Sequence, residues 1–248
     1  MCYNKNMKNI LITGASGGIG SEIARSFAPL GYRLLLVYNS NEKEIKKLEK
    51  ELSTITELAV YKCDLTDSKD LSNMIDSIID QFDHIDCLVN CAGASLIKQI
   101  QDTTDEDYSR LLDTNLKSTI MTTALVSKYM IREKFGRIVN ISSMWGVVGA
   151  SMESLYSASK GAINSFTLSL AKELGYSGIT VNAVCPGLID TKMNANINKS
   201  DLQDIIDNTP LQRIGTPKDV ANIVEFLCSD KASFITGQII TVDGGFSL

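Results

Sequence analysis

The sequence predicts a single α/β domain: a doubly wound, seven-stranded parallel sheet with helices on both faces. Short apolar runs recur along the chain, and helical patterns of a length suited to parallel crossovers separate them. No linker, repeat or low-complexity tract divides the 248 residues. With 44% hydrophobic residues, a chain of this length can bury the core of one domain.

The first predicted unit is a strand at residues 9–13, a glycine-rich turn and a helix with apolar positions from Ile19 to Phe27. The second strand, Arg33–Tyr38, is apolar at consecutive positions, as expected when both faces are covered. A charged amphipathic helix, Glu42–Leu52, follows it. Further strands are expected at residues 58–63, 87–90, 136–142, 180–184 and 238–242.

Composition excludes several classes of function. The net charge of -5 and the lack of a long basic run argue against a nucleic-acid partner. The six cysteines form no Cys-x-x-Cys pair and His84 is the single histidine, so no metal site is expected. The polar start and the absence of a membrane-length apolar stretch predict a cytoplasmic protein with no membrane partner and with reduced thiols.

The turn after the first strand, TGASGGIG, is a candidate dinucleotide site. Its glycines permit a tight turn and let backbone N–H groups at a helix N-terminus approach a pyrophosphate. A glycine turn without a ligand is the alternative, but the strand–turn–helix setting favours a Rossmann-type cofactor loop. The candidate residues are Gly14, Ser16, Gly17, Gly18, Ile19 and Gly20.

The end of the second strand bears on the choice of cofactor. A carboxylate there accepts hydrogen bonds from the ribose 2′-hydroxyl of NAD and repels a 2′-phosphate. This chain has Asn39 and Ser40 instead, which can donate to a phosphate. NADPH is therefore favoured over NADH, although neither this turn nor the glycine loop contains an arginine.

Two further strand ends supply cofactor candidates. Asp64, followed by Leu65, can accept from the adenine amino group or can cap the next helix, and both readings stay open. The NCAG segment that ends the fourth strand has small residues that let the backbone pass beside a flat cofactor. Its candidates are Asn90, Ala92 and Gly93.

Tyr156 and Lys160 are four residues apart and so project from one face of a helix. A nearby ammonium is expected to lower the phenol pKa from about 10 and so to suit Tyr156 to general acid catalysis. Such a pair also arises by chance, so its setting matters: it follows a strand that ends in two serines. Ser143 is preferred over Ser142 as a hydroxyl that reaches the same carbonyl oxygen, and a turn-capping hydroxyl is the alternative.

Polar, weakly periodic residues 190–208 interrupt the regular pattern, and we expect a mobile substrate lid there.

Together these motifs resemble the short-chain dehydrogenases/reductases, over Ile10 through Phe246. The family's Thr-Gly-x-x-x-Gly-x-Gly loop begins at Thr13, its Asn-Asn-Ala-Gly stands as NCAG, and its Tyr-x-x-x-Lys is Tyr156 to Lys160. The resemblance implies that the chain is an NAD(P)-dependent carbonyl reductase and a homotetramer.

The resemblance also implies roles for single residues. Tyr156 would protonate the carbonyl oxygen, and Ser143, thirteen residues earlier, would orient it. Lys160 would hold the ribose hydroxyls, and Asn115 would support a proton-relay water. After the sixth strand, the segment that begins with Pro186 and Gly187 would bring Ile189 and Thr191 to the nicotinamide carboxamide.

Within the family, residues 209–245 resemble the 3-oxoacyl-[acyl-carrier-protein] reductases, which implies a 3-oxoacyl thioester on acyl carrier protein as substrate. Two positions depart from that pattern. Gly17 stands where an arginine is frequent, and Ser177 stands where a basic residue contacts the acidic carrier. Lys134 remains for one carrier contact.

Residues 143–153 resemble instead the reductases that act on the 5-aminopentanone group of elongation factor P. That substrate carries an ammonium, which Glu153, expected on the Tyr156 helix, can pair with. The alternative is a first-turn glutamate that complements the helix dipole. Trp145 is either a substrate wall or a core residue. A non-catalytic dinucleotide-binding sensor or scaffold is the alternative from another class, and the complete set of Ser143, Asn115, Tyr156 and Lys160 disfavours it.

Overall fold

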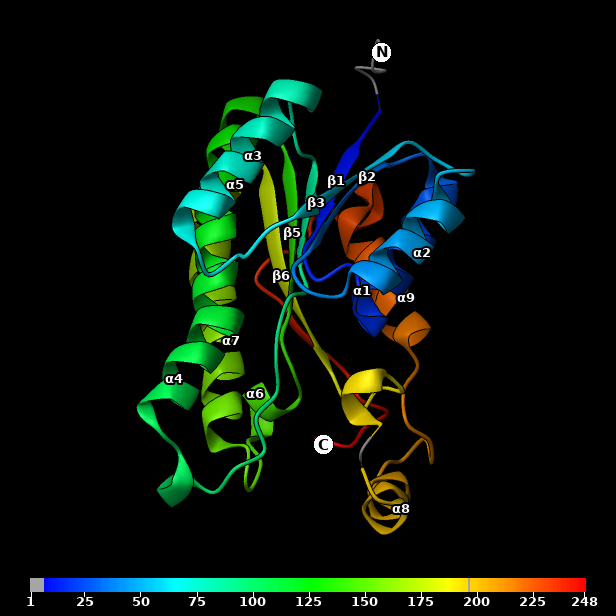
Figure 1. Ribbon diagram of the computed structural model, residues 1–248, viewed down its shortest axis with the longest axis vertical. Helices are drawn as coiled ribbons and strands as arrows, with labels where there is room; N and C mark the ends of the chain where they lie inside the picture. Colours follow the sequence, from blue (N-terminus) through cyan, green and yellow to red (C-terminus); the bar gives the residue numbers. More distant parts are fainter. Residues whose placement is uncertain (1–6, 196) are drawn as a thin grey trace.

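Seven parallel strands form one sheet in the order β3-β2-β1-β4-β5-β6-β7 (Figure 1). The computed structural model describes residues 7–195 and 197–248. The strands are β1 (Asn9–Ile12), β2 (Arg33–Tyr38), β3 (Leu58–Lys62), β4 (Cys87–Asn90), β5 (Gly136–Ile141), β6 (Ile179–Pro186) and β7 (Ile239–Val242). The predicted fold class, with all seven strands, is confirmed.

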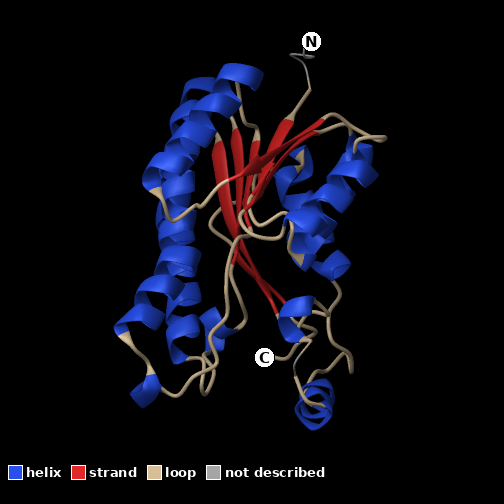
Figure 2. Cartoon of the chain, viewed as in Figure 1, coloured by secondary structure: helices blue, strands red, loops and turns tan. Residues whose placement is uncertain are grey.

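Helices cover both faces of the sheet (Figure 2). On one face lie α1 (Gly18–Phe27), α2 (Glu42–Leu52) and α9 (Pro217–Cys228), and on the other α3 (Ser68–Phe82), α4 (Asp105–Leu112), α5 (Ser118–Glu133) and α7 (Ser154–Leu174). Two short helices, α6 (Trp145–Val148) and α8 (Lys199–Asp207), lie beyond the carboxyl ends of the strands. Single turns include the π-helical turn η3 (Asp113–Lys117) and the 3-10 turn η5 (Lys192–Asn194).

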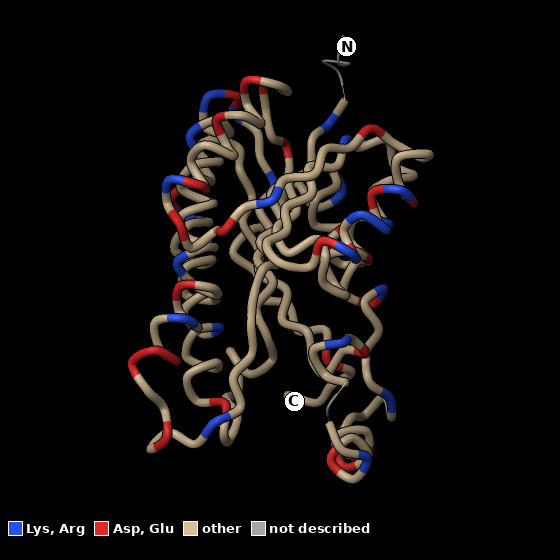
Figure 3. The backbone as a smooth tube through the Cα atoms, in the orientation of Figure 1, with Lys and Arg blue, Asp and Glu red and all other residues tan. Residues whose placement is uncertain are grey.

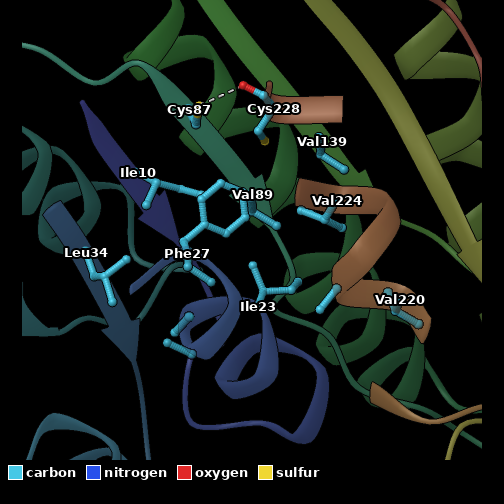
Figure 4. Close-up of a cluster of buried hydrophobic side chains, with 14 of the residues drawn as sticks. Ile10, Ile23, Phe27, Leu34, Cys87, Val89, Val139, Val220, Val224 and Cys228 are labelled. Atoms are coloured by element: carbon cyan, nitrogen blue, oxygen red, sulfur yellow. Dashed lines mark hydrogen bonds between the residues drawn. The ribbon is translucent and has the colours of Figure 1, made fainter. Parts of the chain in front are cut away.

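Alternating side chains of the central strands supply two separate cores. In β1, Ile10 packs with Phe27 of α1 and Val224 of α9 (Figure 4). Ile12 belongs to the same core, whereas Leu11 belongs to the core beneath α3, α5 and α7. Each of these side chains is at most 1% exposed, and burying one contributes roughly 1.5–3 kcal/mol. This two-sided burial explains why the central strands are apolar at consecutive positions.

Predicted and observed strand boundaries agree to within one residue, except at the carboxyl end of the sixth strand, which tertiary pairing extends. The sixth strand continues to Pro186 because Pro186 pairs with Val242 of β7. Within the predicted lid, Asn198 accepts a hydrogen bond from the backbone N–H of Asp201 at 2.9 Å and starts α8. Residue 196 of that segment lies outside the described residues. No helix among those described is both long and apolar enough to cross a membrane.

The strand order places β1 and β4 side by side at the centre, where the chain changes its winding direction. Ligands of open parallel sheets bind beyond the carboxyl ends of the strands at this switch point. Charged residues of both signs alternate along the outer helices, and the sheet is largely uncharged (Figure 3). A ligand is therefore expected at the carboxyl edge of the sheet, beyond β1 and β4.

Candidate active site

A cleft of about 770 Å³ opens at the carboxyl edge of the sheet. It is lined by the segments that follow β1, β2, β3, β4, β5 and β6 and by the start of α7. Nearly every predicted cofactor residue lines it: Gly14, Ser16, Gly17, Gly18, Ile19, Gly20, Asn39, Ser40, Asp64, Leu65, Ala92, Gly93, Tyr156, Lys160, Pro186, Gly187, Ile189 and Thr191. Sequence reasoning therefore located the cleft.

The glycine loop is held tightly against the segment after β4. Thr13 Oγ1 accepts hydrogen bonds from the backbone N–H groups of Cys91 at 3.0 Å and Ala92 at 3.1 Å. Gly14 has φ +65°, and a Cβ there would lie 2.9 Å from the backbone of residues 91 and 92. Only glycine combines that dihedral with that approach.

The start of α1 fits a dinucleotide pyrophosphate. A Cβ on Gly18 would lie 2.7 Å from Cγ2 of Thr191, and one on Gly20 would meet the carbonyl of Gly14. The first turn of α1 contains no acidic residue, so its N–H groups and helix dipole face the cleft without a competing carboxylate. These close contacts at the start of α1, and not merely the presence of glycines, indicate a dinucleotide-binding site. We call this group the glycine cradle.

At the end of β2 the cleft is lined by neutral polar residues. Asn39 and Ser40 face it, and the turn contains no carboxylate. Asp64 also lines it and accepts hydrogen bonds from the backbone N–H and the hydroxyl of Thr66 at 3.0 and 2.8 Å. The helix cap of α3 is Asp67. The capping alternative for Asp64 is therefore wrong, and an adenine contact stays a prediction.

Three side chains named from sequence meet at the ends of β5 and α7. Tyr156 and Lys160 lie one turn apart on α7, and Ser143 follows β5. The Ser143 hydroxyl lies beside the Tyr156 phenol, close enough to lower its pKa. The Ser142 hydroxyl instead donates to the Lys160 carbonyl at 3.0 Å, so it fixes α7 against β5. These different positions of the two hydroxyls agree with the preference for Ser143 over Ser142.

Burial controls the titration of both functional groups on α7. Desolvation raises the pKa of Tyr156 to about 12, and the nearby Ser143 hydroxyl opposes that rise. Desolvation also lowers the pKa of Lys160 to about 8. The Lys160 ammonium donates to the Ile141 carbonyl at 2.9 Å and lies 5.8 Å from the centroid of the Tyr156 ring. The predicted lowering of the phenol pKa is thus wrong, because desolvation of the buried phenol is the largest effect on it.

Asn115 lies in the π-helical turn η3, fully buried beside the cleft. Its Oδ1 accepts from the Ala94 N–H at 2.8 Å, and its Nδ2 donates to the Ala94 carbonyl at 3.0 Å and to Ser159 Oγ at 3.1 Å. The side chain therefore ties the segment after β4 to the turn of α7 that bears Lys160. A π-turn at such a position is frequent at functional sites.

Asn90 differs from its predicted role, because it is buried and does not line the cleft. Its Nδ2 donates to Thr123 Oγ1 and to Asn140 Oδ1, each at 2.9 Å. Asn140 in turn donates to Thr167 Oγ1 at 2.9 Å. The pair forms a polar row from α5 through β4 and β5 to α7, so Asn90 supports the sheet beneath the site.

The residues that bear on substrate choice fall at two ends of the molecule. Glu153 lines the cleft and is half-buried, and this burial raises its pKa, while nearby Trp145 opposes the rise. It precedes α7 as the N-cap residue without a capping hydrogen bond, so its placement on the helix was wrong. Trp145 lines the cleft and packs edge-on against Phe246 at 5.6 Å between ring centroids. Lys134 ends α5 just before β5, at the opposite edge of the sheet.

The predicted lid contributes more to the cleft than the sequence suggested. Besides Thr191, it lines the cleft with Lys192, Met193, Asn194, Ile197, Asn198, Asp201 and Ile205. The only sequence signal for these residues was their position after the Pro-Gly segment, since their pattern is weakly periodic. Lid motion stays a prediction.

Comparisons with known proteins agree with this geometry. The family described as Enoyl-(Acyl carrier protein) reductase matches residues 14–247. The chain belongs to the short-chain dehydrogenase/reductase family. It is 41% identical to "Uncharacterized oxidoreductase YmfI" of Bacillus subtilis, with 96% of this chain and 98% of that protein covered. It is 40% identical to "3-oxoacyl-[acyl-carrier-protein] reductase FabG" of Rickettsia felis, with 96% of each chain covered.

Solved structures of the family superpose closely on the chain. A putative gluconate dehydrogenase from Agrobacterium tumefaciens has a TM-score of 0.92 at 29% identity and covers 97% of this chain and 96% of its own. A short-chain type dehydrogenase/reductase from Mycobacterium ulcerans has the same TM-score at 30% identity, with 97% of this chain and 90% of its own covered. This short-chain dehydrogenase/reductase is an NAD(P)-dependent oxidoreductase.

Proposed function

We propose that the chain reduces a ketone to a secondary alcohol with NADPH. The observation that supports this best is the meeting of Ser143, Tyr156 and Lys160 in one cleft with the glycine cradle. Neutral polar residues at the end of β2 support NADPH over NADH, because no carboxylate there repels a 2′-phosphate.

The residues divide the work as follows. The bound dinucleotide supplies the hydride. Tyr156, kept protonated at neutral pH by its raised pKa, donates its proton to the carbonyl oxygen, which Ser143 holds by a hydrogen bond. Lys160 gives one N–H to Ile141 and keeps its other donors for the ribose hydroxyls or a water. Asn115 positions this turn of α7 and supports the proton-relay water.

As substrate we propose a 3-oxoacyl thioester borne by acyl carrier protein, reduced to the 3-hydroxyacyl product. Support comes from the relatives named 3-oxoacyl-[acyl-carrier-protein] reductase, which are 35–40% identical over nearly the whole chain. We also propose a homotetramer, with residues 190–208 acting as the substrate lid. Lys134 lies at the opposite edge of the sheet, so it cannot contact the carrier at the cleft of its own subunit.

The reaction is tested by NADPH oxidation with an acetoacetyl thioester, with Tyr156→Phe as the active-site variant. We expect turnover to fall about 10²–10⁴-fold, the usual contribution of a general acid, with NADPH binding retained. Tyr176→Phe is the matched control, since Tyr176 is fully exposed. Cofactor binding without turnover of any ketone by the unaltered protein would favour a dinucleotide-binding sensor and refute the reductase.

A second substrate is favoured by one specific observation, the half-buried carboxylate of Glu153 in the cleft. Among the described residues that line the cleft, Glu153 is the carboxylate whose negative charge raises the pKa of nearby Tyr156. An anion at this depth suits a ketone with an ammonium group better than an acyl chain. The 5-aminopentanone group on elongation factor P has that chemistry.

Glu153→Gln separates the two substrates. With an aminoketone substrate, loss of the charge should raise KM about tenfold with little change in kcat, as expected for a lost charge-assisted contact. With an acetoacetyl thioester, the same variant should keep or improve kcat/KM. An aminoketone KM that is unchanged by the substitution would remove the argument for elongation factor P.

A further inference from the structure

Positive charge is scarce in the cleft. Among the described residues that line it, the lysines and arginines are Lys160 and Lys192. Lys160 is buried at the catalytic end, where its ammonium donates to Ile141. Lys192, in turn η5, is therefore the lining cation that remains for a phosphate group elsewhere in the cleft.

Lys192 reaches the end of the cleft that is formed by β2 and α2. Its Nζ lies 2.7 Å from Oε1 of Glu44 in the first turn of α2. Glu44 is three residues beyond Asn41, the N-cap residue of α2, which lines the cleft beside Asn39 and Ser40. The side chain of Lys192 thus spans from the segment after β6 to the turn where the adenosine ribose of a dinucleotide is expected.

The ion pair between Lys192 and Glu44 is a weak contact. The ion pair is exposed, with 83% of the Lys192 side chain accessible, so it is worth little in itself and can exchange. A phosphate placed between α2 and η5 would meet the Glu44 carboxylate as a like charge unless a cation screened it. Lys192 can accept the phosphate as a new partner without leaving the cleft.

We propose that Lys192 binds the 2′-phosphate of NADPH, exchanging the Glu44 carboxylate for the phosphate, and so determines the cofactor preference. The contact also ties the segment after β6 to α2 when the phosphate is present. Lys192 supplies a cation that the glycine loop lacks, because Gly17 stands there where an arginine is frequent. The turn after β2 lacks a cation as well. The inference rests on the proposed preference for NADPH.

The test is the binding of NADPH and NADH, each titrated calorimetrically without any ketone. Lys192→Met should weaken NADPH binding about five- to tenfold, as expected for one partly exposed charge-assisted contact, and should change NADH binding less than twofold. Lys192→Arg should retain the preference. Glu44→Gln should tighten NADPH binding and leave NADH binding unchanged, because a competing partner and a like charge are removed.

Lys50→Met is the matched control, since Lys50 is an exposed lysine in the last turn of α2 that does not line the cleft. It should leave both affinities unchanged. If the unaltered protein prefers NADPH and Lys192→Met keeps that preference, the assignment of Lys192 is wrong while the NADPH proposal stands. Equal losses for both cofactors would place Lys192 at the pyrophosphate and overturn the 2′-phosphate assignment. An unaltered protein without preference would overturn both proposals.

Discussion

Lys160 is held in a position that costs folding free energy. Its side chain is 5% exposed, and burial lowers its pKa from 10.5 to about 8. The difference between the two pKa values corresponds to about 3 kcal/mol against the protonated lysine in the folded protein. Replacing Lys160 by Met keeps the stem and removes the charge, at the cost of the hydrogen bond to the Ile141 carbonyl, about 1 kcal/mol. We therefore expect Lys160→Met to raise the free energy of unfolding by about 2 kcal/mol at pH 7 while it abolishes turnover.

The pH dependence gives this prediction its sign. Because the folded pKa of Lys160 lies below the unfolded value, the unfolded chain binds more protons between pH 8 and 10.5. The unaltered protein gains stability from this group as the pH rises through that window, and Lys160→Met does not. The advantage of the variant should be constant below pH 8 and should disappear by about pH 10.5.

The measurement is urea unfolding of both proteins at equal protein concentration, because assembly into the proposed homotetramer would make apparent stability depend on concentration. The difference between the two proteins cancels the titration of other groups. A variant that is less stable than the parent at pH 7, or a difference that does not change between pH 7 and 10, would refute the argument from desolvation.

Two further substitutions test the glycine loop and the cap of α9. Gly14→Ala should lower the free energy of unfolding by about 3 kcal/mol, because φ +65° is combined with backbone contacts at 2.9 Å. The same change at Gly31, which has φ +77° and open space, should cost only about 1 kcal/mol in the same urea assay. Asp219→Asn should cost about 1 kcal/mol at pH 7, because the Asp219 carboxylate accepts a hydrogen bond from the backbone N–H of Thr216, the N-cap residue of α9, and pairs with Arg213 at 2.8 Å. Since Arg213 holds the pKa of this carboxyl well below its usual range, that cost should fade as the pH falls below 4, and a difference that persists in acid would contradict it.

The sequence predicted the layers and the location of the cleft because both depend on local patterns. Apolar runs such as Arg33–Tyr38 can be buried on both faces only in a parallel sheet covered by helices. The order of these units places the carboxyl ends of all the strands at one edge of the sheet, whatever side chains follow each strand. The spacing of Tyr156 and Lys160 then puts the two on one helix face.

The tertiary structure decided what depends on neighbours that are distant in sequence. The rise in the Tyr156 pKa comes from burial, which spacing along a helix cannot report. Asn90 serves the sheet because Thr123 and Asn140 lie within reach of its amide.

The positive charge at the end of the cleft near α2 also depends on residues that are distant in sequence. Neither the glycine loop nor the turn after β2 contains an arginine, and the cation that lines this end among the described residues is Lys192, from a segment more than 150 residues further along the chain. Sequence thus determined by itself which backbone segments meet at the carboxyl edge. Only the folded chain decided which side chains face the cleft there, because solvation, hydrogen bonding and charge pairing are set by contacts in space.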